Sequence, residues 1–118
     1  MSDVAKKKVS VKFYQTANGT EPTKSWLLRL SKLDRKLIGA DIKTIEYGWP
    51  IGMPVCRSMK DGLYEVRTKL DSRRSARVLF CFHDDLMILL HGFIKKSQKT
   101  PQSDLSLARS RKKEVENG

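Results

Sequence analysis

Three β-prone segments separated by very short links dominate the second half of the chain and constrain its fold most strongly. They cover about 63–69, 75–82 and 86–94, and their runs of Val, Leu, Ile and Phe are typical of strands. The links are residues 70–74 and 83–85. Such links join antiparallel neighbours, because a parallel connection needs a dozen or more residues. The sequence therefore predicts an antiparallel three-stranded meander.

The first half of the chain predicts one strand followed by two helices. Val9 to Phe13 alternates apolar and polar residues with a period of two, as in a half-buried strand. Thr20 is the expected N-cap of a short helix that has Pro22 in its first turn. Ser31 is expected to cap a second helix in a capping-box pattern. This helix ends where residues 48–62, which contain several Pro and Gly, predict an irregular crossing loop.

A final helix over residues 102–113 completes the expected order β-α-α-β-β-β-α. This order belongs to the α+β class, with an antiparallel or mixed sheet packed on helices. A length of 118 residues indicates one domain over 1–118. We expect residues 1–8 to form a basic N-terminal tail and residues 102–118 a C-terminal helix and tail.

The charge of the chain points to an anionic partner. The 24 Lys and Arg residues against 13 Asp and Glu residues give a formal net charge of +11, which exceeds what solubility needs. A nucleic acid or an acidic protein is the expected partner. Charge alone is equally compatible with an enzyme acting on RNA and with a basic domain without chemistry.

Cysteine usage and hydropathy indicate the compartment. Cys56 and Cys81 lack CxxC spacing, so we expect neither a disulfide nor a metal cluster, as in a reducing compartment. The longest apolar run, 86–90, is too short to span a bilayer, and residues 1–8 lack the apolar core of a signal peptide. We therefore expect a cytoplasmic protein with no membrane partner.

Isolated cations on apolar strands form the candidate site. Arg67 and Arg77 each lie within a β-prone run, where a charge is unfavourable unless it meets solvent or a partner. A hairpin centred on Ser72 sets position 67 opposite position 77, so the two arginines converge. A second hairpin centred near 84–85 would set position 77 opposite Gly92, whose missing side chain would leave room for a ligand backbone.

Lysines after the last strand extend this candidate site. Lys95, Lys96 and Lys99 would lie at its rim, and Arg73 and Arg74 in the first hairpin link are further candidates for RNA contacts. RNA carries its own nucleophile, so a protein need only remove the 2′-hydroxyl proton, stabilise the phosphate and protonate the leaving oxygen. Arginine cannot readily act as a base, whereas a lysine among other cations has a lowered pKa. One of the three lysines is therefore a candidate general base, and no metal or other cofactor is expected.

Histidines and aromatic residues are weaker candidates. His91, on the last strand, could take part in proton transfer, although a packed or hydrogen-bonded histidine is the commoner case. His83 lies in a turn and is expected to be solvated. Phe93 could stack on an unpaired base. Tyr64 alternates with Arg67 along its strand and is expected to face the core.

Three blocks of sequence follow one another in the second half of the chain: DGLYEVR at 61–67, ARVLF at 76–80 and LHGFIKKSQKTP at 90–101. Together they resemble the RelE/ParE toxin superfamily, and within it the phage-derived HigB-like branch of type II toxin–antitoxin systems. The likeness covers nearly the whole chain, from the strand near Val11 to the helix after Pro101.

The resemblance implies a small RelE-like fold and a toxin that acts as a ribosome-dependent mRNA endoribonuclease. It implies as partners the ribosome, mRNA and a cognate antitoxin, expected to be a helix-turn-helix protein through which the toxin reaches operator DNA. Arg67 and Arg77 match basic positions of the superfamily, and Lys95 and Lys96 are similar candidates. A tyrosine that some relatives use near the terminal region has no counterpart, because no tyrosine follows Tyr64.

Two other functions stay open at this point. A toxin of the same fold could act on another target such as gyrase, because fold does not fix function. Such relatives generally lack a converging basic site. A noncatalytic nucleic-acid-binding accessory protein would also explain the charge, and Arg67→Ala would then weaken binding with no activity to lose.

Overall fold

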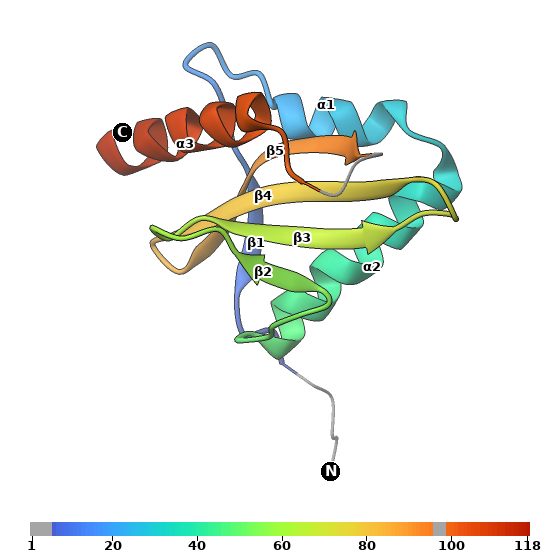
Figure 1. The fold of residues 1–118 in the computed structure, drawn as a ribbon. Coiled ribbons are helices and arrows are strands. Elements are labelled where there is room, and N and C mark those ends of the chain that lie inside the picture. Colours follow the sequence, from blue (N-terminus) through green and yellow to red (C-terminus); the bar gives the residue numbers. More distant parts are fainter. Residues whose placement is uncertain (1–5, 96–98) are drawn as a thin grey trace.

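The computed structural model describes residues 6–95 and 99–118 and shows a five-stranded mixed sheet with helices packed on it (Figure 1). The strands are β1 (Ser10–Phe13), β2 (Cys56–Ser58), β3 (Tyr64–Lys69), β4 (Ser75–His83) and β5 (Leu86–Lys95). The helices are α1 (Pro22–Arg29), α2 (Lys32–Gly48) and α3 (Gln102–Asn117). The strand order is β1-β5-β4-β3-β2, with β1 parallel to β5 and the other pairs antiparallel. The expected α+β class is confirmed, and β2 is a short strand in the stretch that was expected to be loop.

The meander β3-β4-β5 forms as expected, and its first register is confirmed. Arg67 pairs with Arg77 across β3 and β4. The five-residue link 70–74 fixes this register, and Asp71 stabilises it by accepting hydrogen bonds from the backbone of Arg73 and Arg74 at 2.9 and 2.8 Å.

The second register differs from the prediction by one residue. A β-bulge between Leu79 and Phe80 shifts the pairing of β4 with β5. Arg77 therefore pairs with Phe93, and Val78 pairs with Gly92. The prediction that Gly92 faces Arg77 is wrong, because the extra residue moves Gly92 to the opposite face of the sheet.

Gly92 is needed for packing and leaves no room for a ligand. A Cβ built on Gly92 would lie 2.3 Å from Cζ3 of Trp26, a residue of α1. The indole of Trp26 fills the space above the glycine, so the predicted role of Gly92 in ligand access is also wrong. The residue instead lets α1 approach β5 closely.

Gly92→Ala is expected to lower the free energy of unfolding by about 1–3 kcal/mol, because the new methyl group overlaps a buried ring. Urea unfolding measures the change. Gly39→Ala is the matched control, since a Cβ at Gly39 meets nothing within 4 Å and the residue lies inside α2. A Gly92→Ala variant as stable as the control would contradict the packing described here.

The helix starts follow the sequence only in part. Ser31 caps α2 as expected, because its Oγ accepts a hydrogen bond from the Asp34 N–H at 3.1 Å. Pro22 opens α1 as expected, but the N-cap is Glu21 and not Thr20. The Thr20 hydroxyl donates instead to Asn18 Oδ1 at 2.8 Å, within the preceding turn.

Two apolar clusters lie on opposite faces of the sheet. The larger joins α2 to the strands and is centred on Ile38, Ile45, Val66 and Phe80. Tyr64 packs against it and stacks on Phe80 with ring centroids 5.5 Å apart, which confirms the predicted core role of Tyr64. The smaller cluster lies under α3 and has the buried residues Tyr14, Leu63, Leu79, Cys81, Ile88, Leu90 and Ala108.

Helix α3 runs to Asn117, four residues beyond the predicted end, and in Figure 1 it lies away from α2 with the sheet between them. Along the chain, residues 96–101 separate its start from the end of β5. Across residues 6–95 and 99–118, no helix combines the length and the apolar character needed to cross a membrane.

Candidate active site

Four cations from four adjacent strands lie on the sheet face that carries α3. Arg67 of β3 is directly opposite Arg77 of β4, and Lys95 of β5 is opposite Ser75, two residues from Arg77. Side chains two residues apart point to the same face of a strand. Arg57 of β2 joins this face because it pairs with Glu65, two residues before Arg67. The four cations are called the cationic cluster below.

Two members of the cationic cluster are buried. Arg77 and Lys95 are each only 6% exposed. Burial lowers the pKa of Arg77, an effect that Glu65 opposes and that Arg67 and Arg57 reinforce. Burial also lowers the pKa of the Lys95 ammonium, and repulsion from Arg77 lowers it further. The lowered lysine pKa agrees with the sequence-based expectation, although burial and not like charge is its main cause.

A buried carboxylate lies among these cations. Glu65 is 1% exposed, and its Oε1 is 3.5 Å from Arg77 Nε and 4.0 Å from Arg67 Nε. Its Oε2 accepts a hydrogen bond from the Thr100 hydroxyl at 2.5 Å. A buried cation needs such a counter-charge, because desolvation without one is costly. Sequence reasoning missed Glu65, although its spacing of two residues from Arg67 was a signal for the same face.

The two arginines are held by different contacts. Arg77 Nη1 donates to the carbonyl oxygen of Ala76 at 3.0 Å, and its Nε has no hydrogen-bond partner among the described residues. Arg67 Nη1 lies 3.2 Å from the Sδ of Met53, an exposed residue of the 48–62 segment. A guanidinium has five N–H donors in a planar fork that suits phosphate oxygens. The cluster can therefore bind a phosphodiester.

His91 and Phe93 lie next to the cationic cluster on β5. Their rings stack with centroids 5.6 Å apart. His91 Nε2 is 2.6 Å from Asp104 Oδ1, in the first turn of α3. The histidine is thus hydrogen-bonded, and its part in catalysis stays a prediction. His83 pairs with Asp84 at 3.3 Å in the β4–β5 turn.

The remaining candidates lie at the periphery or outside the described residues. The Arg74 guanidinium contacts Asp71 Oδ2 at 2.8 Å and Asp34 Oδ2 at 3.0 Å, which links the β3–β4 turn to α2. Arg73 and Lys99 are exposed. Lys96 lies outside the described residues. RNA contacts by Arg73, Arg74 and Lys99, and a catalytic role for Lys96, stay predictions.

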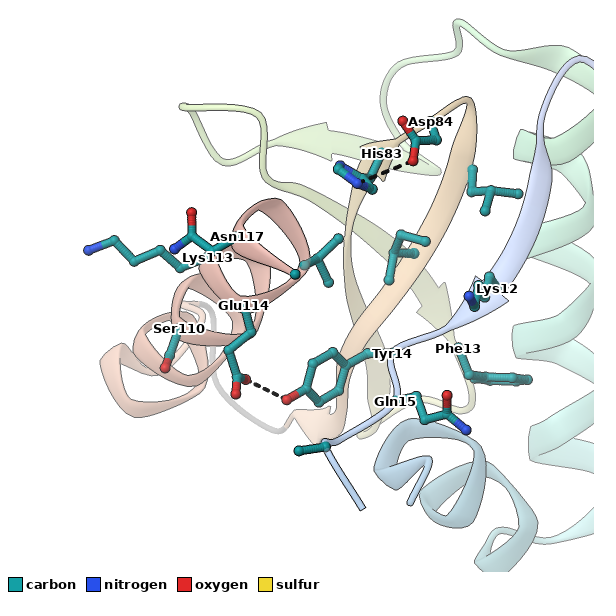
Figure 2. A pocket seen from close by; sticks show the side chains of 15 residues that line it. Lys12, Phe13, Tyr14, Gln15, His83, Asp84, Ser110, Lys113, Glu114 and Asn117 are labelled. Atoms are coloured by element: carbon teal, nitrogen blue, oxygen red, sulfur yellow. Dashed lines mark hydrogen bonds and ion pairs between the residues drawn. The ribbon is translucent and has the colours of Figure 1, made fainter. Parts of the chain in front are cut away.

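A hollow in the described structure lies apart from the cationic cluster. Figure 2 shows it between α3, β1 and the β4–β5 turn, with a volume of about 790 Å³. The Tyr14 hydroxyl donates to Glu114 across it. Burial raises the pKa of Tyr14, and the hydrogen bond to Glu114 adds to this effect. None of the four cations lines this hollow.

Thiols and metal sites offer no second candidate in the described part of the chain. Cys56 and Cys81 are free and buried, and burial raises the pKa of each thiol to about 11. A thiol with such a pKa is a poor nucleophile near neutral pH. Among the described residues, no three His, Cys, Asp or Glu side chains gather where they could hold a metal ion.

The five-stranded mixed sheet with three helices is consistent with a small RelE-like α+β fold. A family model described as Phage derived protein Gp49-like (DUF891) matches residues 25–113, which include the whole cluster. The chain therefore belongs to this phage-derived, toxin-like family. No curated protein matches the chain.

Proposed function

We propose that this protein is a HigB-like toxin that cuts mRNA on the ribosome as a metal-independent endoribonuclease. The observation that carries the proposal is the convergence of Arg67, Arg77 and Lys95 on one face, with two of these cations buried. Burying cations is unfavourable, so their arrangement favours a function that needs strong local positive charge. The family membership supports a toxin.

The proposed reaction uses the nucleophile of the substrate. The RNA 2′-oxygen attacks the adjacent phosphorus, the bond from phosphorus to the 5′-oxygen breaks, and a cyclic phosphate and a 5′-hydroxyl remain. Arg67 and Arg77 stabilise the crowded, doubly charged phosphorus centre. Lys95, in its neutral form, takes the 2′-hydroxyl proton, and His91 on the same face is the candidate that protonates the leaving oxygen.

The proposed partners follow from this site. Ribosome-bound mRNA is the substrate, and a cognate antitoxin silences the toxin in the cytoplasm. The antitoxin should be acidic where it contacts the cationic cluster, because opposite potentials favour association. A helix-turn-helix antitoxin would also bring the toxin to operator DNA.

The rate of cleavage is expected to increase with pH, because Lys95 must lose a proton to act as the base. The pKa of Lys95 is lowered, so the increase should be centred below pH 10.5, the ordinary pKa of lysine. The pH dependence of kcat/KM on ribosome-bound mRNA measures this. Lys95→Arg keeps a cation that cannot deprotonate, so the rise should disappear. Lys36→Arg, at an exposed position on α2, is the control. An unchanged pH profile in Lys95→Arg would assign the base to another group.

The direct test incubates the purified protein with mRNA in a translating extract and with the same mRNA free in solution. We expect cuts on translated messages and much slower cutting of free RNA. Equal cutting of both would contradict ribosome dependence. Expression of the protein in a growing bacterium separates the alternatives: growth arrest with intact messages would favour another target, and the absence of arrest would favour a binding protein.

A further inference from the structure

Glu65 is placed so that it cannot itself touch a substrate. Only 1% of the residue is exposed, and both carboxylate oxygens are engaged. Oε2 accepts a hydrogen bond from the Thr100 hydroxyl, and Oε1 faces the Nε atoms of Arg77 and Arg67. A general base must come within hydrogen-bond reach of the proton that it removes. Any effect of Glu65 on the reaction therefore passes through its neighbours.

The orientation of Arg77 depends on two anchors. Its Nη1 donates to Ala76 O at 3.0 Å, and its Nε lies 3.5 Å from Glu65 Oε1. One hydrogen bond leaves a planar guanidinium free to rotate about it. The ion-pair contact between Nε and Glu65, although it is not a hydrogen bond, holds the charged group on the side of the carboxylate. The carboxylate can provide this anchor only while its own rotamer is fixed.

Thr100 fixes that rotamer from a distant part of the chain. It lies between Lys99 and Pro101, just before α3, and its hydroxyl reaches across to β3. The bond ties Thr100, directly before α3, to the strand that carries Arg67. The start of α3 and the arginine-bearing strand are thus linked.

We propose that Glu65 and Thr100 form a positioning pair that orients Arg77 for transition-state binding. The inference rests on the proposed RNA cleavage for its activity readout. A guanidinium displaced by about 1 Å can cost about 10²-fold in rate. Loss of either member of the pair should therefore lower kcat while leaving the positive charge that binds RNA in place.

The test compares Thr100→Val, Thr100→Ser and Glu65→Gln in single-turnover cleavage of ribosome-bound mRNA. Thr100→Val replaces the hydroxyl by a methyl group of similar size and should lower the single-turnover rate constant about tenfold or more, whereas Thr100→Ser keeps the hydroxyl and should retain most of the native rate. Glu65→Gln should lower this rate constant at least as much, and Glu65→Gln with Thr100→Val should be no slower than Glu65→Gln alone, because the residues act as a unit. Thr44→Val is the matched control, since it removes a hydroxyl bonded to Ala40 O on α2.

Binding separates positioning from a merely structural role. Affinity for a 2′-O-methylated RNA, which cannot be cut, should stay within about twofold of native in Thr100→Val. In Glu65→Gln it should stay equal or increase, because the cluster gains net positive charge. A Thr100→Val variant that cleaves at the native rate, or that loses binding and thermal stability together with cleavage, would overturn the proposal.

Hydrogen exchange followed by NMR spectroscopy tests the positioning pair separately from the proposed RNA cleavage. The Arg77 Nε–H has no hydrogen-bond partner among the described residues, but burial shields it from water. It should therefore exchange slowly in the native chain and in Thr100→Ser, and faster in Thr100→Val and Glu65→Gln, where the guanidinium is no longer held in place. Equal exchange in all four proteins would overturn the positioning pair even if RNA is cut. If the native chain cuts no RNA, the proposed function fails, and this measurement alone decides whether Glu65 and Thr100 position Arg77.

Discussion

Arg77→Ala is expected to lower the rate of mRNA cleavage by about 10²- to 10³-fold, the usual loss when one preorganised donor to a developing oxyanion is removed. Arg77 lies directly opposite Arg67 and is 6% exposed, so water cannot easily replace its guanidinium in the complex. Single-turnover cleavage of mRNA on translating ribosomes measures the rate. Expression of the variant in a growing bacterium should give little growth arrest.

Two further variants separate chemistry from folding. Arg77→Lys keeps a positive charge beside Glu65 but loses the planar fork, so its rate should also fall although the protein remains folded. Arg29→Ala removes an exposed cation at the end of α1, far along the chain from the cluster, and should cleave at nearly the native rate. If Arg77→Ala arrests growth as completely as the native chain, the assignment of Arg77 to the active site is wrong.

Phe80→Ala is expected to lower the free energy of unfolding by about 3–5 kcal/mol, because it leaves a cavity in the larger apolar cluster. Phe80 is fully buried and contacts the rings of Trp49, Tyr64 and Phe82 at centroid distances of 6.3, 5.5 and 5.6 Å. Urea unfolding followed by circular dichroism measures the change. A loss of this size is a large share of the stability of a domain of this length.

Phe82→Ala provides the comparison for that result. Phe82 lies two residues along the same strand and is only partly buried, so its removal should cost clearly less. Equal losses for Phe80→Ala and Phe82→Ala would contradict the assignment of Phe80 to the centre of the cluster.

The sequence allowed the prediction of the meander and of the pairing between Arg67 and Arg77. In an antiparallel pair, the residue numbers of facing partners add up to a constant that the centre of the turn sets. A short link therefore identifies the partner of each residue. The same argument gave the wrong partner for Gly92, because a β-bulge depends on local packing and has no reliable sequence signal here. Because of the bulge, Gly92 lies against Trp26 and does not provide the predicted space for a ligand.

The composition of the site was predictable only where strand alternation applied. Glu65 lies two residues before Arg67, so strand alternation places both side chains on the same face. Glu65 could therefore have been included in the predicted site. Arg57 lies on a strand of three residues within a Pro- and Gly-containing stretch, too short for any periodicity to appear. Thr100 reaches Glu65 across 35 positions of the chain, a tertiary contact that no local pattern encodes.

The measurement that tests the central claim most directly is 5′-end mapping of messenger RNA after controlled expression in a growing bacterium. It compares the native chain with a variant that carries both Arg67→Ala and Arg77→Ala. We expect new 5′ ends confined to translated reading frames with the native chain and their loss in the double variant. Growth arrest without new 5′ ends, or cuts that persist in the double variant, would contradict the assignment of this site to mRNA cleavage.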